Sequence, residues 1–431
     1  MGESMIILLN LNNADVNAQD KYGQTPLHYA AMTGNLWAAK DLIQSCGATV
    51  QIEDTHQMTP LIVAATHGHI DMVKLFLDQM GTDIRHADAS KQTALHRAAK
   101  GGHLSVVQLL LRMSRSMKNF KEFLDGKDSK HKTPLYHASS NGHVQVASQL
   151  LSEGADVNAE TITMATPLHA AAGVGAVDII TLLLQHDCDL DVCDVYQRTP
   201  LMHAAAGNHL NAMSLLLSKG ANINHKDLNH STALLIGGQN GHSNAVQTLL
   251  KMKADLKALD KLDKSVVFHC AEQGKAETLK IILKHKNFPI EMIDVTDCYG
   301  HSPLHIAVLK GHMDAMLLLL KHGASLDVKN EELDTILHLA ARKGCASMVQ
   351  ELLPMSYTLL NAENENLDTP LHLACKWGQE EVVRLLLEAG ADVTATNSSS
   401  AMPLHMAAYK GHVRCCQLLL ESDAPIDVFD K

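Results

Sequence analysis

Residues 25–43 read TPLHYAAMTGNLWAAKDLI, and this stretch is the pattern from which the rest of the chain is built. Thr25 can cap the free backbone donors of a helix, and the proline after it suits a first helical turn because its missing N–H would have no partner there. Gly34 suits the positive φ at which helices often end. A second apolar stretch follows at helical spacing. The segment therefore predicts two short helices, neither of which can bury its apolar face alone.

The same pattern recurs along the chain at intervals of mostly 33 or 34 residues. A period of this length predicts a stacked array of small helical units. Two of the intervals are longer, which places insertions near residues 112–126 and 286–294. The first residues of the repeated motif are Thr25, Thr59, Thr93, Thr133, Thr166, Thr199, Thr232, Ser265, Ser302, Thr335, Thr369 and Met402.

This pattern resembles the ankyrin repeat, whose signature is a turn plus two helices that contain T-P-L-H-x-A. The resemblance covers nearly all of the 431 residues. It implies an all-α solenoid of stacked helix-turn-helix units with β-turn or hairpin fingers. Residues 1–19 are then the C-terminal half of a truncated repeat, residues 20–428 are twelve repeats, and residues 429–431 begin a further one.

Both ends of the chain carry apolar residues like those of interior repeats, at positions 5–9 and 416–420. Terminal repeats of such arrays normally carry a polar outer face. We therefore expect the chain to be a fragment of a longer protein, so a function carried by a flanking domain would not be visible in this sequence.

Two repeats depart from the pattern. The repeat of Thr232 has Gly237 and Gly238 where alanines are expected, and the repeat of Ser265 keeps almost none of the motif. We predict that these two repeats are the least stable.

The first insertion alternates basic residues with Met117, Phe120 and Phe123. It is interpreted either as a basic extension of the preceding helix or as a longer solvated loop. The second insertion follows a lysine-rich run, and a longer solvated loop is one interpretation of it. Each insertion is a candidate partner-specific protrusion.

The composition narrows the class of protein. Nine cysteines show no framework spacing, which predicts reduced, intracellular thiols. No apolar stretch approaches the roughly 18 residues that a membrane span needs, and a net charge of −11 argues against nucleic acid as the main partner. We expect a cytoplasmic protein, or a domain on the cytosolic side of a membrane if the parent is a channel, without direct membrane insertion.

The 27 histidines recur at fixed positions of the repeat. The family resemblance implies that the histidine of T-P-L-H hydrogen-bonds the backbone of the adjoining turn as a neutral imidazole. Because no closely spaced pair such as C-x-x-C occurs, we predict no metal and no cofactor. The histidines within the motif are His28, His96, His169, His305, His338, His372 and His405. A second set follows the first motif residue by ten positions and consists of His69, His103, His143, His209, His242, His312 and His412. A third set lies one position beyond the motif histidine and consists of His137, His203 and His269.

Catalytic motifs are not found. The sequence has no G-x-S-x-G, no G-x-x-x-x-G-K-[ST], no H-E-x-x-H, and no G-x-G-x-x-G after a strand. We predict that the chain is not an enzyme.

The resemblance implies that partners bind at the turn tips before the motif and at the end of the first helix, seven and eight residues after its first residue. In the last four repeats these positions form a basic and aromatic stripe on the inner, concave face, with acids at the turn tips. The predicted protein-binding residues are Lys310, Arg342, Lys343, Lys376, Trp377, Tyr409 and Lys410, with Glu331, Glu332 and Asp334 at the tips.

Two interpretations of this stripe remain open. It is a groove for an acidic or amphipathic peptide, with Trp377 and Tyr409 as rigid anchors and Arg342 as a fork for carboxylates. Alternatively, lysine and arginine at helix ends are ordinary solubilising residues, favourable beside a helix C-terminus.

The function predicted from the sequence is a non-catalytic protein-interaction scaffold. The alternative is the cytosolic regulatory domain of a membrane protein that resembles the ankyrin-type transient receptor potential channels. A substrate-recruiting arm of a ligase or kinase is a third class. The resemblance also implies possible hydroxylation of Asn17 and Asn158, which end D-V-N turns; the alternative for both is a purely structural role in the turn.

Overall fold

The computed structural model describes residues 15–78 and 82–425. Within them it contains twenty-five α-helices, α2 to α26, and two short 3-10 helices, η1 and η2. Strand pairing in the same residues is limited to an isolated bridge between Ala87 and Thr93. The predicted all-α fold is confirmed. The expected half repeat at residues 1–19 lies mostly outside the described residues, and the repeat start at 429–431 lies wholly outside them.

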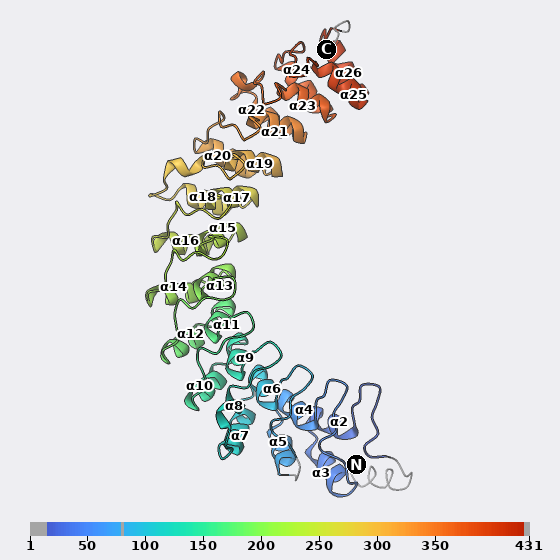
Figure 1. Cartoon of the computed structure of the whole chain (residues 1–431), viewed down its shortest axis with the longest axis vertical. Helices are drawn as coiled ribbons and strands as arrows, with labels where there is room; N and C mark the ends of the chain where they lie inside the picture. The colour runs from blue at the N-terminus through green and yellow to red at the C-terminus, as the bar shows by residue number, and fades with distance from the viewer. Residues whose placement is uncertain (1–14, 79–81, 426–431) are drawn as a thin grey trace. The chain divides into compact units, whose positions relative to one another are not determined.

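The chain divides into two compact units, Met1–Asn222 and Ile223–Lys431, and helix pairs follow one another along each (Figure 1). In the first unit the first helices of the pairs are α2 (Pro26–Thr33), α4 (Pro60–His67), α6 (Ala94–Gly101), α9 (Pro134–Ser140), α11 (Pro167–Val174) and α13 (Pro200–Ala206). The second helices are α3 (Leu36–Gln44), α5 (Ile70–Leu77), α7 (Leu104–Ser114), α10 (Val144–Ser152), α12 (Val177–Leu184) and α14 (Leu210–Ser218).

The second unit repeats this arrangement. Its first helices are α15 (Ala233–Asn240), α17 (Val266–Glu272), α19 (Pro303–Lys310), α21 (Ile336–Lys343), α23 (Pro370–Lys376) and α25 (Pro403–Lys410). Its second helices are α16 (Ser243–Lys251), α18 (Ala276–Leu283), α20 (Met313–Lys321), α22 (Ala346–Leu352), α24 (Glu380–Glu388) and α26 (Val413–Glu421).

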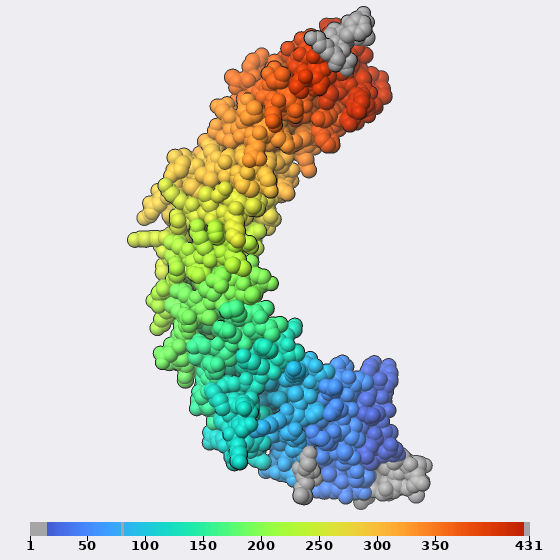
Figure 2. All heavy atoms as spheres, viewed as in Figure 1, coloured from blue at the N-terminus to red at the C-terminus, as the bar shows by residue number. Residues whose placement is uncertain are grey.

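Within each unit, every first helix packs against the next first helix. Second helices also pack against the next second helix, for example α5 against α7 and α22 against α24. Each unit therefore has a first-helix row and a second-helix row. Figure 2 shows the repeats of each unit as a continuous packed body. The apolar faces that a single pair leaves open are buried by its neighbours, as expected for a repeat array.

Helix α21 illustrates how local sequence sets the boundaries. Thr335 is extended, with φ −84° and ψ 171°, and precedes the first helical residue. Gly344 ends the helix at φ 79°, where only glycine avoids a steric cost. Ala340 and Ala341 are fully buried. Their small side chains let the neighbouring first helices approach closely.

A β-turn finger connects each pair to the next. In the finger of Asp297, the carboxylate oxygen Oδ1 accepts hydrogen bonds from the backbone N–H groups of Tyr299 and His301, at 3.0 and 2.9 Å. Neighbouring fingers are joined by backbone bonds, such as that from Glu331 N–H to the carbonyl of Tyr299 at 3.2 Å. The fingers are therefore ordered by local side-chain bonds and by their neighbours.

The two irregular repeats fit each other closely. A Cβ atom added to Gly238 would lie 2.5 Å from Cγ2 of Val266 on the next first helix. Val266 and Phe268 are buried with exposures of 1% and 0%. The glycine is therefore matched to a bulkier neighbour, which is a packing relation that the sequence interpretation missed.

Gly238→Ala should destabilise the second unit by about 1–2 kcal/mol, although alanine normally favours a helix over glycine by about 0.5–1 kcal/mol. The added methyl group overlaps Val266, whose branched side chain is held by the core. Urea unfolding monitored by circular dichroism measures the change. Val266→Ala in the same chain should recover part of the loss, and a Gly238→Ala chain as stable as wild type would contradict this packing argument.

The first insertion is neither a simple helix extension nor a solvated loop. Helix α7 runs to Ser114, and the short helix α8 (Phe120–Leu124) follows it with Phe123 and Leu124 buried. Arg115 forms an ion pair with Glu153 of the next repeat. The loop interpretation is therefore wrong here, because the apolar residues of the insertion pack onto the array.

The second insertion forms η1 (Ile290–Ile293), in which Met292 and Ile293 are buried. Glu291 of this turn pairs with Lys257 at 2.7 Å. A further 3-10 turn, η2 (Tyr357–Leu359), follows α22 and buries Leu359. Both turns use apolar residues to close the loop after a second helix, so the solvated-loop interpretation is wrong for this insertion as well.

Candidate functional site

The histidines of the T-P-L-H motif join consecutive repeats. The ring atom Nδ1 of His338 accepts a hydrogen bond from the backbone N–H of Thr335 at 3.2 Å. Its Nε2–H donates to the carbonyl of Asp368, thirty residues on, at 2.9 Å. His28, His96, His169 and His372 make the same two kinds of bond. The bond to the adjoining turn that the resemblance implied is confirmed.

This geometry fixes the neutral form of the ring. If Nδ1 were protonated, it could no longer accept the hydrogen bond from the Thr335 N–H, and the two hydrogens would face each other. Burial accordingly lowers the pKa of four of these histidines to about 4, and lowers the pKa of His28 and His372 as well. The four are His96, His169, His305 and His338.

A second set of histidines bonds backward along the array. The Nε2–H of His143 donates to the carbonyl of Lys100, and that of His209 donates to the carbonyl of Gly173, each at 3.0 Å. The accepting carbonyl always belongs to the residue seven positions after the first motif residue. His69, His103, His312 and His412 follow the same rule.

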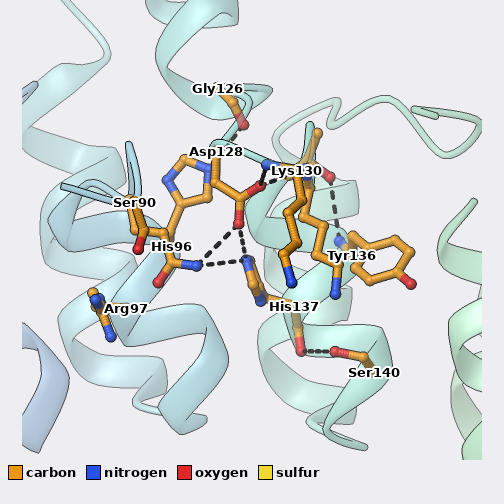
Figure 3. A network of polar contacts seen from close by, with 12 residues as sticks. Ser90, His96, Arg97, Gly126, Asp128, Lys130, Tyr136, His137 and Ser140 are labelled. Carbon is orange, nitrogen blue, oxygen red and sulfur yellow. Dashed lines mark hydrogen bonds and ion pairs between the residues drawn. The ribbon is translucent and has the colours of Figure 1, made fainter. Parts of the chain in front are cut away.

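The third set pairs with the aspartate that begins its own finger. Figure 3 shows the Nε2 atom of His137 directed at Asp128, and the two atoms of this contact lie 2.9 Å apart. Gln92 donates to the same carboxylate oxygen at 2.9 Å. Burial lowers the pKa of His137 although Asp128 opposes the change. The imidazole of His137 therefore joins α9 to its own finger.

The predicted stripe lies on the first-helix row of the second unit. Trp377 and Tyr409 are 55% and 82% exposed, at the ends of the adjacent helices α23 and α25. Lys410 holds its ammonium group 5.1 Å from the centroid of the Tyr409 ring. Lys310 and Lys343 are exposed and Lys376 is half-buried. These residues occupy equivalent positions on four successive first helices.

Two residues of the predicted site have other roles. Asp334 is fully buried, so it cannot contact a partner as a turn-tip acid. Its Oδ1 accepts a bond from the Asn364 side chain at 2.8 Å. Arg342 reaches back to Asp334 at 3.4 Å and to Glu332 at 3.2 Å. The fork expected to hold a partner's carboxylate is therefore already engaged within the chain. Glu331 and Glu332 are exposed, as predicted for turn tips.

The buried position of Asp334 disfavours its charged form. Burial raises the pKa of Asp334, while the Asn364 hydrogen bond and the Arg342 charge act in the opposite direction. Arg342 is 31% exposed along its side chain, whereas Asp334 is 1% exposed. The arginine thus compensates a buried charge and is part of the fold.

Family models of ankyrin repeats match nearly all of this chain. One model, described as ankyrin repeats in three copies, matches residues 2–88, 80–161, 162–227, 232–330 and 326–397. A single-repeat model matches residues 402–431. The chain belongs to the ankyrin-repeat family. This family is typical of non-catalytic protein-interaction domains, and the matching models are not those of an enzyme.

Three relatives show how far the likeness extends. The chain is 33% identical over 107 residues to the transient receptor potential cation channel subfamily A member 1 homolog of Caenorhabditis elegans, and 32% identical over 109 residues to the Drosophila melanogaster protein of that name. These matches cover 25% and 24% of this chain and 9% of each relative. Ankyrin repeat domain-containing protein 13C of Danio rerio is 33% identical over 84 residues, which cover 20% of this chain and 16% of that protein. The chain therefore spans a small part of the relatives that it matches.

The ankyrin fingers carry a feature that the sequence interpretation missed. Leu333 and Leu367 are 45% and 42% exposed, and both have positive φ, at 57° and 56°. Gly300 occupies the same finger position at φ 74°. A leucine in this conformation is strained and also exposes apolar surface. The signal that could have revealed it is an apolar residue at the glycine position of a turn.

The D-V-N asparagines serve as links between ankyrin repeats. The side-chain oxygen of Asn17 accepts from the Thr49 N–H at 2.9 Å, and that of Asn158 accepts from the Asp189 N–H at 3.3 Å. Asn158 is exposed. These bonds support the structural interpretation, and hydroxylation of either asparagine stays a prediction.

Among residues 15–78 and 82–425, no group of three or more histidine, cysteine, aspartate or glutamate side chains could hold a metal ion. No helix in these ranges has both the length and the apolar character needed to cross a membrane.

Proposed function

We propose that this ankyrin array is a non-catalytic scaffold on the cytosolic side of the cell, and that its second unit binds an acidic or amphipathic segment of a partner protein. The binding surface consists of the ends of α19, α21, α23 and α25 together with their fingers. One observation carries the proposal: two large aromatic rings are exposed on adjacent first helices within a row of lysines.

The spacing of this surface suits an extended or helical segment. Neighbouring packed helices lie about 8–10 Å apart, so equivalent residues on successive repeats form a ladder. Eight residues after the first motif residue, this ladder reads Lys310, Lys343, Trp377 and Lys410. Its charge complements a partner that presents acids at matching intervals.

The aromatic rings supply the apolar contacts. Trp377 and Tyr409 bring large area at low entropic cost, and tryptophan and tyrosine dominate binding energy at protein interfaces. Among the described residues, Lys310, Lys343 and Lys376 have no ion-pair partner within the chain. Their ammonium groups can therefore pair with a partner without breaking an existing contact.

The strained finger leucines extend this surface. Holding Leu333 and Leu367 at positive φ costs about 1 kcal/mol each relative to glycine. The same finger position has positive φ at residues such as Gln197 and Ser400, so the conformation belongs to the repeat. The feature that distinguishes Leu333 and Leu367 is a large apolar side chain exposed at the fingertip beside the stripe. We assign both leucines to the partner contact, beside the acids Glu331 and Glu365.

Trp377→Ala with Tyr409→Ala should weaken partner binding by about 2 kcal/mol or more, roughly thirtyfold, because truncation removes the exposed anchors. Affinity purification with the full chain followed by quantitative mass spectrometry identifies partners lost in the variant. Their affinity is then measured by calorimetry. Trp37→Ala is the matched control, because Trp37 is 51% exposed on α3 in the other unit. Equal partner recovery by the double variant and wild type would contradict the proposed surface.

Leu333→Gly with Leu367→Gly gives the same experiment a second arm. The two changes should raise the stability of the second unit while they weaken the same partner. A merely damaged fold cannot produce this combination. Weaker stability together with unchanged binding would remove the leucines from the proposed surface.

A second candidate function follows from the likeness to the cation channels of Caenorhabditis elegans and Drosophila melanogaster. Here the array is the cytosolic regulatory domain of a channel. The full-length protein would then fractionate with membranes and be recovered mainly with copies of itself. Soluble partners lost in the Trp377→Ala and Tyr409→Ala variant would favour the scaffold instead.

A further inference from the structure

The first unit contains a pocket of about 480 Å³ between the ends of two successive helix pairs. The equivalent pocket one repeat further on has about 300 Å³, and His209 is one of the residues that line it. The larger pocket has Ala176 at the position of that histidine. Its lining residues are Ser140, Asn141, Gly142, Val144, Val174, Gly175, Ala176, Val177 and Asp178.

The difference in size comes from the missing imidazole. In the neighbouring repeats, a Cβ added to Gly102 would lie 2.6 Å from Nδ1 of His143, and one added to Gly175 would lie 2.5 Å from Nδ1 of His209. Around Gly142, no such atom lies within 4 Å. The pocket is thus the space that a histidine ring fills in the repeats on either side.

The repeat also specifies the hydrogen bond that is missing. His143 and His209 donate to the carbonyl seven residues after the first motif residue of the preceding repeat. For position 176 this rule indicates the carbonyl of Ser140, a pocket-lining residue that ends α9. Carbonyls in the last turn of a helix lack an intrahelical partner. The methyl group of Ala176 cannot donate to it.

Other repeats replace this histidine with Lys275, Cys345 and Gln379, of which Gln379 keeps a flat N–H donor. Gln379 occupies the position of this histidine in its own repeat, and its side chain lies against Gly344. Its side-chain amide donates to the carbonyl of Arg342 at 3.3 Å. Arg342 lies seven residues after Thr335, so Gln379 makes the bond that the histidines make. Histidine and glutamine thus both place a flat N–H donor on this carbonyl.

The walls of the pocket define the rest of the ligand. Val144 and Val174 are 36% and 47% exposed, which gives the mouth an apolar rim. Asp178 is an exposed acid among the lining residues. A ring with apolar faces fits between the valines, and a positive charge on the ring is favoured by Asp178.

We propose that this pocket binds a flat, N–H-donating ring of the imidazole class, seated over Gly142, whose N–H donates to the carbonyl of Ser140. The ring belongs either to a free small molecule or to a histidine side chain of a partner protein. The site is separate from the stripe of the second unit, and it does not depend on the function proposed for that stripe.

The test uses the full chain with methyl-labelled valine and alanine, and 4-methylimidazole as the probe. Titration should shift the methyl NMR signals of Val144, Val174 and Val177 in a saturable manner in wild type. Ala176→His fills the pocket with the residue that the neighbouring repeats carry, and these shifts should disappear. His209→Ala opens the equivalent pocket one repeat on and should gain a second saturable site.

Two further arms distinguish the sources of the ring. A short capped peptide with a central histidine between two lysines is compared with free 4-methylimidazole and with the same peptide carrying alanine. Binding of the histidine peptide at least tenfold tighter than the free ring indicates a partner side chain, whereas binding no tighter than the free ring indicates a small molecule. Equal shifts in Ala176→His and wild type, or no saturable shift with either probe, would overturn the proposal.

Discussion

Lowering the pH from 7.5 to 4.5 should destabilise the folded chain by about 2–3 kcal/mol for each of the motif histidines His96, His169, His305 and His338. Burial lowers the pKa of His96, His169, His305 and His338 to about 4 in the folded chain. An unfolded histidine titrates near its ordinary value of about 6.5. Between these two values the unfolded chain binds more protons than the folded chain, so stability falls as the pH falls.

The sign follows from the hydrogen bonds. Each ring accepts at Nδ1 from the backbone of its own repeat and donates from Nε2 to a later repeat or finger, as His338 does. Stability that depends on the neutral ring is complete above about pH 6.5 and is lost as the pH falls toward 4. Carboxylates with a lowered pKa, such as Asp128, lose their contribution mainly below this window.

The measurement is urea unfolding at a series of pH values from 7.5 to 4.5, with proton uptake obtained from the slope. His338→Met is a suitable variant, because Met202 occupies the same motif position in the repeat of Thr199. The variant should lose stability at pH 7.5 and take up close to one proton fewer on unfolding near pH 5. An unchanged pH slope would show that His338 is not held in its neutral form.

Arg342→Ala should lower the free energy of unfolding of the second unit by about 2–3 kcal/mol. This loss is smaller than that expected for breaking a fully buried ion pair, because water reaches part of the Arg342 side chain. The change leaves the carboxylate of Asp334 buried without its cation. Removal of Arg342 should therefore also raise the pKa of Asp334 further. The loss should be largest at neutral pH and shrink as the pH is lowered and Asp334 is protonated.

Urea unfolding of three further chains tests this account. Lys343→Ala is the matched control, because Lys343 is the exposed neighbour of Arg342, and it should change stability by less than about 0.5 kcal/mol. Asp334→Asn alone and together with Arg342→Ala completes a double-mutant cycle. The double variant should be more stable than Arg342→Ala alone. If the cycle shows no coupling between Arg342 and Asp334, Arg342 is free to bind a partner, and this account is wrong.

Much of the fold could be read from the sequence because its determinants are local and repeated. Thr335 and Gly344 set the ends of α21 through backbone geometry that each residue type favours by itself. The alanine and leucine positions of the core recur with the same period. The motif histidines could also be placed correctly, since their contacts recur in several repeats.

The candidate site was less predictable, because the availability of a side chain depends on contacts that the motif does not specify. Trp377 and Tyr409 are exposed as expected. Arg342, however, is held by an acid that only the folded finger brings to it, and Asp334 is buried against Asn364 of the next finger. The strain at Leu333 likewise depends on the φ that its finger requires.

The sequence by itself determined the repeat, its helix boundaries, its core positions and its family, because capping and apolar periodicity act within one repeat. Only the tertiary structure decided which charged groups lack an ion-pair partner, beside which glycines a neighbouring side chain fills the space, and where a pocket opens at Ala176. Those properties depend on how one repeat stacks on the next. In a stacked array, the contacts that a side chain makes outside its own repeat come from residues about thirty to forty positions away.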